Sequence, residues 1–270
     1  MQENPLKASL LNNSPTLGCW LTLDSTAVAE VLAHCGFEWL VIDMEHGPSN
    51  EISVTQQIRA IESAAARGIN VSPVVRVTAN DPSYVKRAMD AGASNILFPN
   101  IMTAAEARLA AQSMRYPVGH QAGSRGVAGI VRAAGYGMNP ALVASANDRA
   151  CTIVQIESAE AVDNVEEIAR VDGVDCLFIG PADLAASLGH FGDARHQDVQ
   201  HAIITTIKAA EVAGKATGIF AVSPEEVRHY RNLGVSFISL HSDVAWLASG
   251  ASSARAMTED EQATSLTPTY

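Results

Sequence analysis

The feature that most constrains the fold is a regular alternation of short apolar runs with amphipathic segments between about residues 17 and 250. Eight such runs stand at residues 18–23, 39–44, 73–77, 95–99, 152–156, 176–179, 217–220 and 237–240. Apolar side chains follow one another in these runs instead of alternating with polar ones. That pattern is typical of parallel strands that are buried on both faces of a sheet.

Helix signals lie in the intervals between the runs. Asp81 followed by Pro82 is typical of an N-cap and the first residue of a helix, and Thr103 and Glu106 have the spacing of a capping box. Helices are expected at residues 26–34, 84–90, 103–114, 158–169, 198–213 and 223–233. Strands that alternate with helices at this rhythm favour βαβ units.

Eight βα units most simply close into a single-domain (β/α)₈ TIM barrel, an α/β fold that takes about 250 residues. The 270 residues of this chain fit one such barrel at residues 17–250. Residues 1–16 then form an N-terminal segment, and residues 251–270 form a polar C-terminal tail that we expect to be flexible. A doubly wound open sheet is the alternative architecture.

Composition argues against two classes of partner. The formal net charge is −11, only 17% of residues are charged, and no stripe of Lys and Arg occurs, so neither nucleic acid nor an anionic membrane is an expected partner.

We find no signal-peptide pattern and no apolar run of membrane-spanning length. The four cysteines are widely spaced without a C-x-x-C pair, which is typical of reduced thiols. We therefore expect a cytoplasmic protein.

One stretch interrupts the alternation. Residues 116–147 are rich in glycine and contain Arg125 and Arg132. Because this stretch follows the fourth predicted strand, we expect it on the side of the barrel where active sites lie. Long irregular insertions are often functional, and a functional loop and a surface excursion or oligomer contact remain equal alternatives.

Two acidic residues stand just beyond predicted strands. Glu157 closes the run at 151–156, and Asp183 follows the run at 176–179 and the residues Gly180-Pro181-Ala182. Carboxylates at the carboxyl ends of barrel strands are suitable ligands for an oxygen-ligated divalent metal. With no thiolate and few histidines nearby, the expected ion is Mg²⁺ or Mn²⁺. The alternative is that each acid only caps the following helix.

Other polar residues converge on the same rim. His46 follows the second strand with Asp43 three residues before it, so an oriented His–carboxylate pair acting as general base is one interpretation, and a structural histidine is the other. Arg76 ends the third strand. It is either a cation aimed at developing negative charge or the partner of Glu157 or Asp183 in an ion pair.

Gln155 lies two residues before Glu157, so both side chains leave the same face of the strand and point into the barrel mouth. Backbone N–H groups around Gly180, Pro181 and Ala182 are suited to hold a carboxylate or phosphate. No Lys stands at the end of a predicted strand, which disfavours a Schiff-base aldolase. Dinucleotide-binding, P-loop and α/β-hydrolase motifs do not occur in the sequence.

Several segments together carry a family resemblance. The sequences GFEWLVIDMEHGP, VVRV with a following NDP, LFPNI, GSRGV, VQIES and FIGPADLAASLG occur in this order. They resemble the HpcH/HpaI aldolase family, the metal-dependent class II pyruvate aldolases, and the match extends from about residue 17 to residue 248.

The resemblance implies a barrel in a homo-oligomer, a trimer or a hexamer, in which the last helix is exchanged between neighbours. It implies that Glu157 and Asp183 hold Mg²⁺, Mn²⁺ or Co²⁺. Gln155 would line the pocket of a pyruvyl group, and the amides around Gly180, Pro181 and Ala182 would bind its carboxylate.

The implied reaction is retro-aldol cleavage of a 4-hydroxy-2-oxo acid to pyruvate and an aldehyde. Arg76 would stabilise the enolate oxygen, and His46, tuned by Asp43, would accept the proton of the C4 hydroxyl. The expected substrates are 4-hydroxy-2-oxoheptanedioate or a 2-dehydro-3-deoxy sugar acid, and Phe220 is expected to narrow the aldehyde pocket. The alternatives are a citrate-lyase-like acyl-CoA lyase and a non-catalytic barrel that binds oxo acids.

Overall fold

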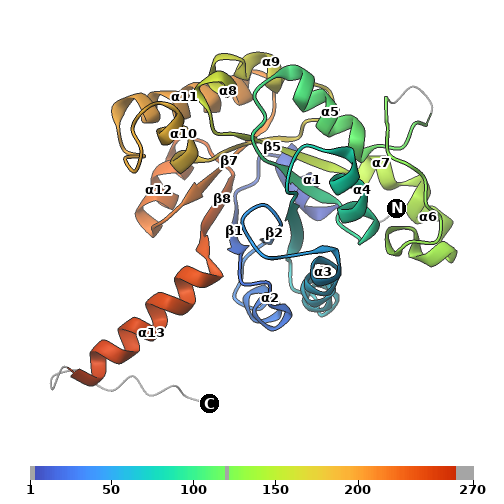
Figure 1. Cartoon of the computed structure of the whole chain (residues 1–270), viewed down its shortest axis with the longest axis horizontal. Coiled ribbons are helices and arrows are strands. Elements are labelled where there is room, and N and C mark those ends of the chain that lie inside the picture. Colours follow the sequence, from blue (N-terminus) through green and yellow to red (C-terminus); the bar gives the residue numbers. More distant parts are fainter. Residues whose placement is uncertain (1–3, 119–121, 260–270) are drawn as a thin grey trace.

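Eight parallel strands close into a barrel in the order β1 to β8 (Figure 1). The computed structural model describes residues 4–118 and 122–259. The strands are β1 Thr16–Leu21, β2 Trp39–Asp43, β3 Ser72–Arg76, β4 Asn95–Phe98, β5 Cys151–Ile156, β6 Cys176–Ile179, β7 Ala216–Ala221 and β8 Phe237–Ser242. The TIM barrel is confirmed, and every strand boundary lies within two residues of its predicted position.

Helices surround the barrel as the alternation predicts. They are α2 Thr26–Ala33, α3 Glu51–Ala66, α4 Pro82–Asp90, α5 Ala104–Met114, α8 Ala159–Asp163, α9 Val165–Ala169, α10 Pro181–Ser187, α11 Gln197–Val212 and α12 Pro224–Asn232. Neither α3 nor α10 is among the predicted helical ranges. The helix expected at 158–169 is divided at Asn164, which caps both α8 and α9 and donates a hydrogen bond to the Met102 carbonyl.

Aromatic side chains fill the interior of the barrel. Trp39 stacks on Phe237 with ring centroids 3.9 Å apart, and Phe178 meets Phe237 edge to face. Two glycines make room for these rings, because a Cβ on Gly18 would lie 2.1 Å from the Trp39 ring and one on Gly218 would lie 2.6 Å from Phe178. The interior is therefore a packed core, as in other barrels of this kind.

The N-terminal segment closes one end of the barrel. Its helix α1, Pro5–Leu11, buries Leu6 and Leu10 in the same cluster as the interior aromatic rings. The Asn4 side chain donates to Asn95 Oδ1 at 2.7 Å, at the start of β4. Lys7 Nζ donates to the Ala150 carbonyl at 2.6 Å, just before β5. The closed end is thus the end where the strands begin.

The glycine-rich insertion lies at that same end, so its predicted position beside the active site is wrong. The helix α5 separates β4 from the insertion and returns the chain to the opposite end of the barrel. The insertion contains η1 Arg132–Gly137, α6 Pro140–Ala144 and α7 Ala146–Arg149. Arg125 pairs with Asp90 at the end of α4. Arg132 pairs with Glu62 of α3.

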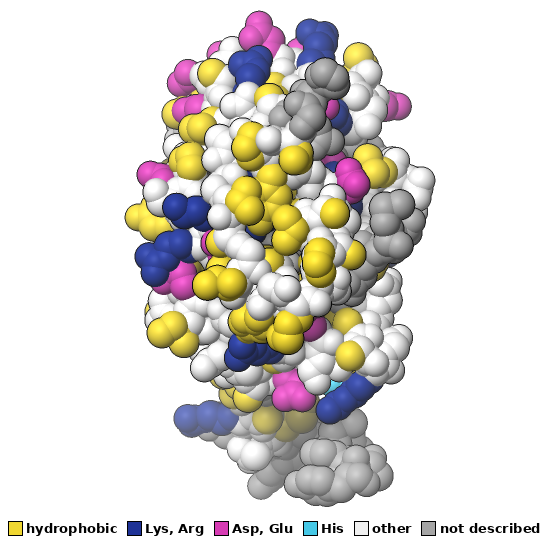
Figure 2. Space-filling view, turned by 90° about the vertical axis from the view of Figure 1, so that its right-hand side faces the viewer, with side chains coloured by type: hydrophobic (Ala, Val, Ile, Leu, Met, Phe, Trp, Pro, Cys, Tyr) yellow, Lys and Arg dark blue, Asp and Glu magenta, His cyan; other side chains and the backbone are white. Residues whose placement is uncertain are grey.

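Hydrophobic side chains of the insertion are exposed. Val127, Ile130 and Met138 each expose more than two thirds of their surface. Figure 2 views the molecule from the side of α6 and α7 and shows hydrophobic side chains gathered there, with most charged groups at the margins. This surface is suited to a protein contact.

The final helix extends the chain beyond the predicted barrel boundary. Helix α13, Asp243–Glu259, projects away from the barrel (Figure 1). The predicted tail, residues 251–270, therefore begins inside a helix, and its residues from 260 onward lie outside the described part of the chain. Within the described residues, no helix combines the length and the apolar character needed to cross a membrane.

Candidate active site

A cavity of about 400 Å³ opens at the end of the barrel where the strands finish. Every predicted site residue except Glu157 lines it: Asp43, His46, Arg76, Gln155, Gly180, Pro181, Ala182 and Asp183. Parallel strands bring their carboxyl ends to one rim, which is why residues far apart in sequence meet here. Glu157 adjoins the cavity beneath Gly180, where it accepts a hydrogen bond from the Gln155 side chain.

The Arg76 guanidinium is held from two sides. Arg76 and Asp43 are register partners on β3 and β2, and the carboxylate of Asp43 receives Nε at 2.9 Å and Nη2 at 2.7 Å. Glu45 pairs with Nη1 at 2.7 Å, and the Trp20 ring lies 4.3 Å from the guanidinium carbon. The expected ion pair of Arg76 with Glu157 or Asp183 is therefore wrong. Bidentate pairing fixes the guanidinium plane more firmly than a single contact does.

In the structure, the carboxylate next to the His46 imidazole is not the predicted one. Asp43 Oδ1 accepts the backbone N–H groups of Glu45 and His46, at 3.0 and 3.4 Å, and not the imidazole. The carboxylate nearest the imidazole is Glu45, with Oε2 3.9 Å from Nε2. The His46 side chain is 71% exposed at the cavity mouth. Asp43 thus positions Arg76 and the turn that carries His46, and it does not contact the imidazole as the sequence suggested.

Glu157 is a buried carboxylate with two protein hydrogen bonds. Oε1 accepts the backbone N–H of Asn100 at 2.8 Å, and Oε2 accepts from Gln155 Nε2. Burial raises the pKa of the Glu157 carboxyl to about 7. The Asn100 hydrogen bond opposes this rise, whereas the negative charge of Asp183 adds to it. A cation bound next to Glu157 would favour the ionised form of its carboxyl group.

The residues present fit a divalent cation. Glu157, Asp183 and Glu45 interact electrostatically with one another, and burial also raises the pKa of Glu45. In addition, Gln155 Oε1 is buried and has no hydrogen-bond partner among the described residues. Oxygen donors that carry mutually repelling negative charge are suited to a hard ion such as Mg²⁺ or Mn²⁺.

The residues Gly180, Pro181 and Ala182 contribute unequally. The Gly180 N–H donates to the Ile156 carbonyl at 3.3 Å, and proline has no N–H. Of the three, only Ala182 has a backbone N–H with no hydrogen-bond acceptor among the described residues. Gly180 has a steric role instead. A Cβ there would lie 2.6 Å from Glu157 Oε2, so any side chain at this position would displace the Glu157 carboxylate.

The far side of the cavity is largely apolar. Trp20, Phe178 and Phe220 line it, and Trp20 meets both phenylalanine rings edge to face. Phe220 thus lies where the sequence suggested. Neither the place of Trp20 in the cavity nor the hydrogen bond from Asn100 to Glu157 was predicted from the sequence. The position of Trp20 at the end of the first strand was the available signal for the former, and nothing in the sequence indicated the latter.

Comparisons with known proteins identify the family of this chain. The protein-family model described as HpcH/HpaI aldolase/citrate lyase matches residues 16–249. A hydroxypyruvate/pyruvate aldolase of Paraburkholderia phytofirmans is 52% identical over 245 residues, which cover 90% of this chain and 93% of that protein. A 4-hydroxy-2-oxo-heptane-1,7-dioate aldolase of Klebsiella pneumoniae is 42% identical, with 92% of this chain and 91% of that protein covered.

A crystal structure from Burkholderia cenocepacia, described as a HpcH/HpaI aldolase/citrate lyase family protein, superposes with a TM-score of 0.92 at 47% identity. The match covers 95% of this chain and all of that one. The crystal structure of the citrate synthase SbnG superposes with a TM-score of 0.82 at 26% identity, over 94% of this chain and 97% of that one. By sequence and by structure, this chain belongs to the HpcH/HpaI aldolase/citrate lyase family.

Proposed function

We propose that this protein is a divalent-metal-dependent class II aldolase that cleaves 4-hydroxy-2-oxo acids to pyruvate and an aldehyde, and that also joins them. The observation that carries the proposal is one cavity lined by Arg76, which Asp43 fixes, and by Asp183. The Glu157 carboxylate lies next to Gly180, which also lines this cavity. The names of the relatives from Paraburkholderia and Klebsiella support the aldolase activity.

Cleavage breaks the C3–C4 bond of the substrate and leaves its electron pair on the pyruvyl fragment as an enolate. Glu157 and Asp183 would hold the divalent ion, which when bound supplies a Lewis acid that withdraws electrons from the keto group. Arg76 would donate hydrogen bonds to the oxygen on which negative charge develops. A cation fixed before the reaction stabilises that charge without reorganisation.

The C4 hydroxyl must lose its proton as C4 becomes an aldehyde carbon. His46 is the suitable acceptor, because its imidazole lines the cavity and is accessible at its mouth. The nearby Glu45 carboxylate would stabilise the protonated imidazole. Uptake of a proton at C3 of the enolate then completes pyruvate. In the direction of synthesis, the proton held by His46 returns to the C4 oxygen.

The finer assignments rest on the chemistry of the site. The metal would be Mg²⁺, Mn²⁺ or Co²⁺, since its donors are oxygen atoms. The carboxylate of the pyruvyl group would accept the N–H of Ala182, with Gln155 beside it. The apolar wall of Trp20, Phe178 and Phe220 would accommodate the carbon chain of the aldehyde. The candidate substrates remain 4-hydroxy-2-oxoheptanedioate and 2-dehydro-3-deoxy sugar acids.

The decisive experiment is deuterium exchange into the methyl group of pyruvate, followed by NMR. After treatment with EDTA we expect no exchange, and added Mn²⁺ should restore it. The Glu157→Gln variant should lose metal binding and exchange together. The His46→Ala variant should retain metal binding and be impaired in aldol cleavage. Exchange that is independent of metal would contradict the enolate mechanism.

We also propose that the protein is a homo-oligomer, a trimer or a hexamer. The exposed apolar residues of the insertion and the projecting helix α13 support this assembly. On α13, Leu247 is 64% exposed and Trp246 is 37% exposed.

A cytoplasmic location is supported by the four cysteines, none of which forms a disulfide.

A further inference from the structure

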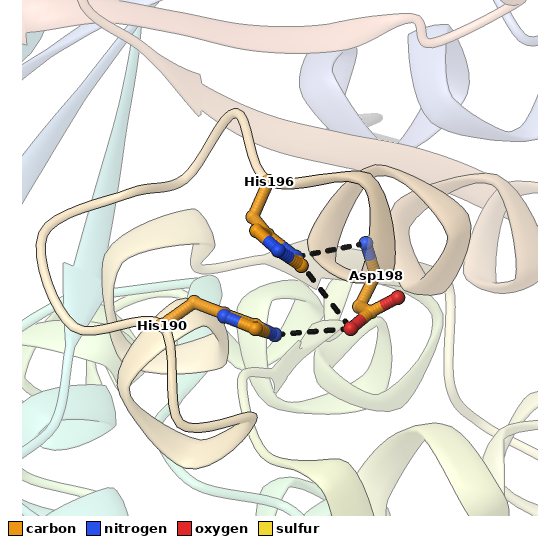
Figure 3. Close-up of side chains that lie close together, drawn as sticks. All are labelled: His190, His196 and Asp198. Carbon is orange, nitrogen blue, oxygen red and sulfur yellow. Dashed lines mark hydrogen bonds and ion pairs between the residues drawn. The ribbon is translucent and has the colours of Figure 1, made fainter.

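A second group of metal-binding side chains lies outside the candidate active site, where the loop after α10 enters helix α11 (Figure 3). His190 Nε2 lies 3.0 Å from Asp198 Oδ2, and His196 Nδ1 lies 3.5 Å from the same oxygen. All three ligand atoms lie within 4.8 Å of one another. Two imidazoles and one carboxylate thus converge on a single point.

We propose that His190, His196 and Asp198 bind a transition-metal ion of the Zn²⁺ class. Tetrahedral zinc with bonds of about 2.0–2.1 Å to nitrogen and oxygen requires ligand atoms about 3.3 Å apart. The two distances to Asp198 Oδ2, 3.0 and 3.5 Å, bracket that value. Three protein ligands leave the fourth position to water.

The protonation of one imidazole already suits a metal. His196 Nδ1 accepts the backbone N–H of Asp198 at 3.3 Å, so this nitrogen presents a lone pair and not a proton. A bound ion would replace that capping hydrogen bond. The two rings now stack with centroids 3.4 Å apart and an angle of 17° between their planes, so they must tilt apart for both nitrogens to face one ion. The imidazoles are partly exposed, which permits both the tilt and the entry of the ion.

This cluster differs chemically from the carboxylate pair of the candidate active site. Imidazole nitrogen favours Zn²⁺, Ni²⁺ or Cu²⁺, whereas a site of oxygen atoms favours Mg²⁺ or Mn²⁺. The proposal is therefore independent of the proposed aldolase reaction, and either one can fail without the other.

The position of the cluster gives the ion a structural consequence. Between His190 and His196, the residues Ala194 and Arg195 line the active-site cavity, and Arg195 pairs with Glu226 of α12 at 3.3 Å. An ion bound to both histidines would close this loop on itself. A closed loop has fewer conformations, so the ion would stiffen one wall of the cavity.

The test is a calorimetric titration of Zn²⁺ into the full chain carrying Glu157→Gln and Asp183→Asn, which removes the carboxylate pair. We expect one zinc ion per chain. Adding His190→Ala or His196→Ala should weaken binding by about tenfold or more, since even the loss of a group that only supports a metal ligand has effects of that size. Adding His201→Ala, at an exposed histidine on α11 outside the cluster, should leave binding unchanged.

Either of two titration results would overturn the proposal. One is the absence of zinc binding in the variant that lacks the carboxylate pair. The other is equal affinity in the His190, His196 and His201 variants, which would assign the ion to another part of the chain. Circular dichroism of each variant verifies that it is folded. X-ray absorption at the zinc edge should show two imidazole ligands, and a shell of oxygen alone would count against the site.

Discussion

Charge is unevenly balanced among the residues of the candidate active site. Four carboxylates, Asp43, Glu45, Glu157 and Asp183, lie in or beside the cavity, and Arg76 forms ion pairs with the first two of them. Glu157 and Asp183 have no cationic partner among the described residues. A divalent ion would supply the missing charge, as the proposed metal-dependent reaction requires.

The first prediction concerns Gly180. In Gly180→Ala the new methyl group would meet Glu157 Oε2 at 2.6 Å and displace the carboxylate. We expect metal affinity and kcat each to fall by about tenfold or more, as in other cases where a group that positions a metal ligand is disturbed. Titration of Mn²⁺ followed by steady-state kinetics measures both.

Gly250→Ala is the matched control. Nothing lies within 4 Å of a Cβ at this exposed helical position, so alanine should leave metal affinity unchanged and stabilise α13 slightly. If Gly180→Ala bound Mn²⁺ as tightly as the wild type, Glu157 would not be the ligand that we assign.

The second prediction concerns Arg76. Lysine keeps the charge but cannot make the bidentate contact with Asp43, so Arg76→Lys should place its ammonium group poorly. We expect kcat for aldol cleavage to fall by about 10²–10³-fold, with metal affinity close to that of the wild type. The control is Arg87→Lys on α4, where Arg87 forms an exposed ion pair with Glu51 of α3; this change should leave kcat unchanged. Equal kinetics in the two variants would remove Arg76 from the reaction.

Among the elements, α1 has a role that its short sequence does not suggest. It caps its own first turn through Asn4 and inserts Leu6 and Leu10 into the barrel interior. Its Lys7 also lies 3.7 Å from Asp175, a buried carboxylate that accepts the Thr152 N–H at 2.8 Å. The helix therefore stabilises the end of the barrel opposite the candidate active site. In TIM barrels that end contributes to stability and not to catalysis.

The third prediction tests this role of α1. Leu10→Ala removes a buried side chain and should lower the free energy of unfolding by about 2–5 kcal/mol. Leu11→Ala, at the adjacent position, removes a side chain that is 66% exposed, so we expect a change within about 0.5 kcal/mol. Urea denaturation compares the two. If both variants lost a similar free energy of unfolding, burial of Leu10 against the barrel interior would not be what stabilises this end.

In the whole molecule, the two ends of the barrel have different roles. The strand ends carry the polar residues of the cavity, while the strand starts carry α1 and the glycine-rich insertion. Arg125 and Arg132 tie the insertion to α4 and α3, so its exposed apolar surface has a defined shape. A surface held in this way is suited to contact with a second copy of the chain.

The fourth prediction concerns assembly. Ile130→Asp places a charge on the apolar surface of the insertion, where Ile130 is 83% exposed. It should dissociate the proposed oligomer, because an unpaired charge is costly to bury in an interface. Val212→Asp changes a side chain of similar exposure, 82%, at the end of α11 and should leave the assembly intact. Light scattering after gel filtration measures the mass. An unchanged mass in Ile130→Asp would place the contacts elsewhere.

The sequence by itself determined the barrel and most of the residues around its mouth. Eight apolar runs admit few folds, because parallel strands must be covered on both faces and each needs a crossover helix. Parallel strands also bring their ends to one rim, so Glu157, Asp183 and Arg76 could be grouped from their positions alone. The family resemblance then supplied the reaction.

Only the tertiary structure decided which of these side chains pair. Asp43 stands three residues from His46 in sequence, but strand register places its carboxylate against Arg76 on the neighbouring strand. The same limit applies to the insertion: the intervening helix α5 decides at which end of the barrel it lies. It applies also to His190 and His196, whose side chains come together because the loop between them folds back. Sequence patterns describe the periodicity of one segment, whereas side-chain partners depend on contacts between segments.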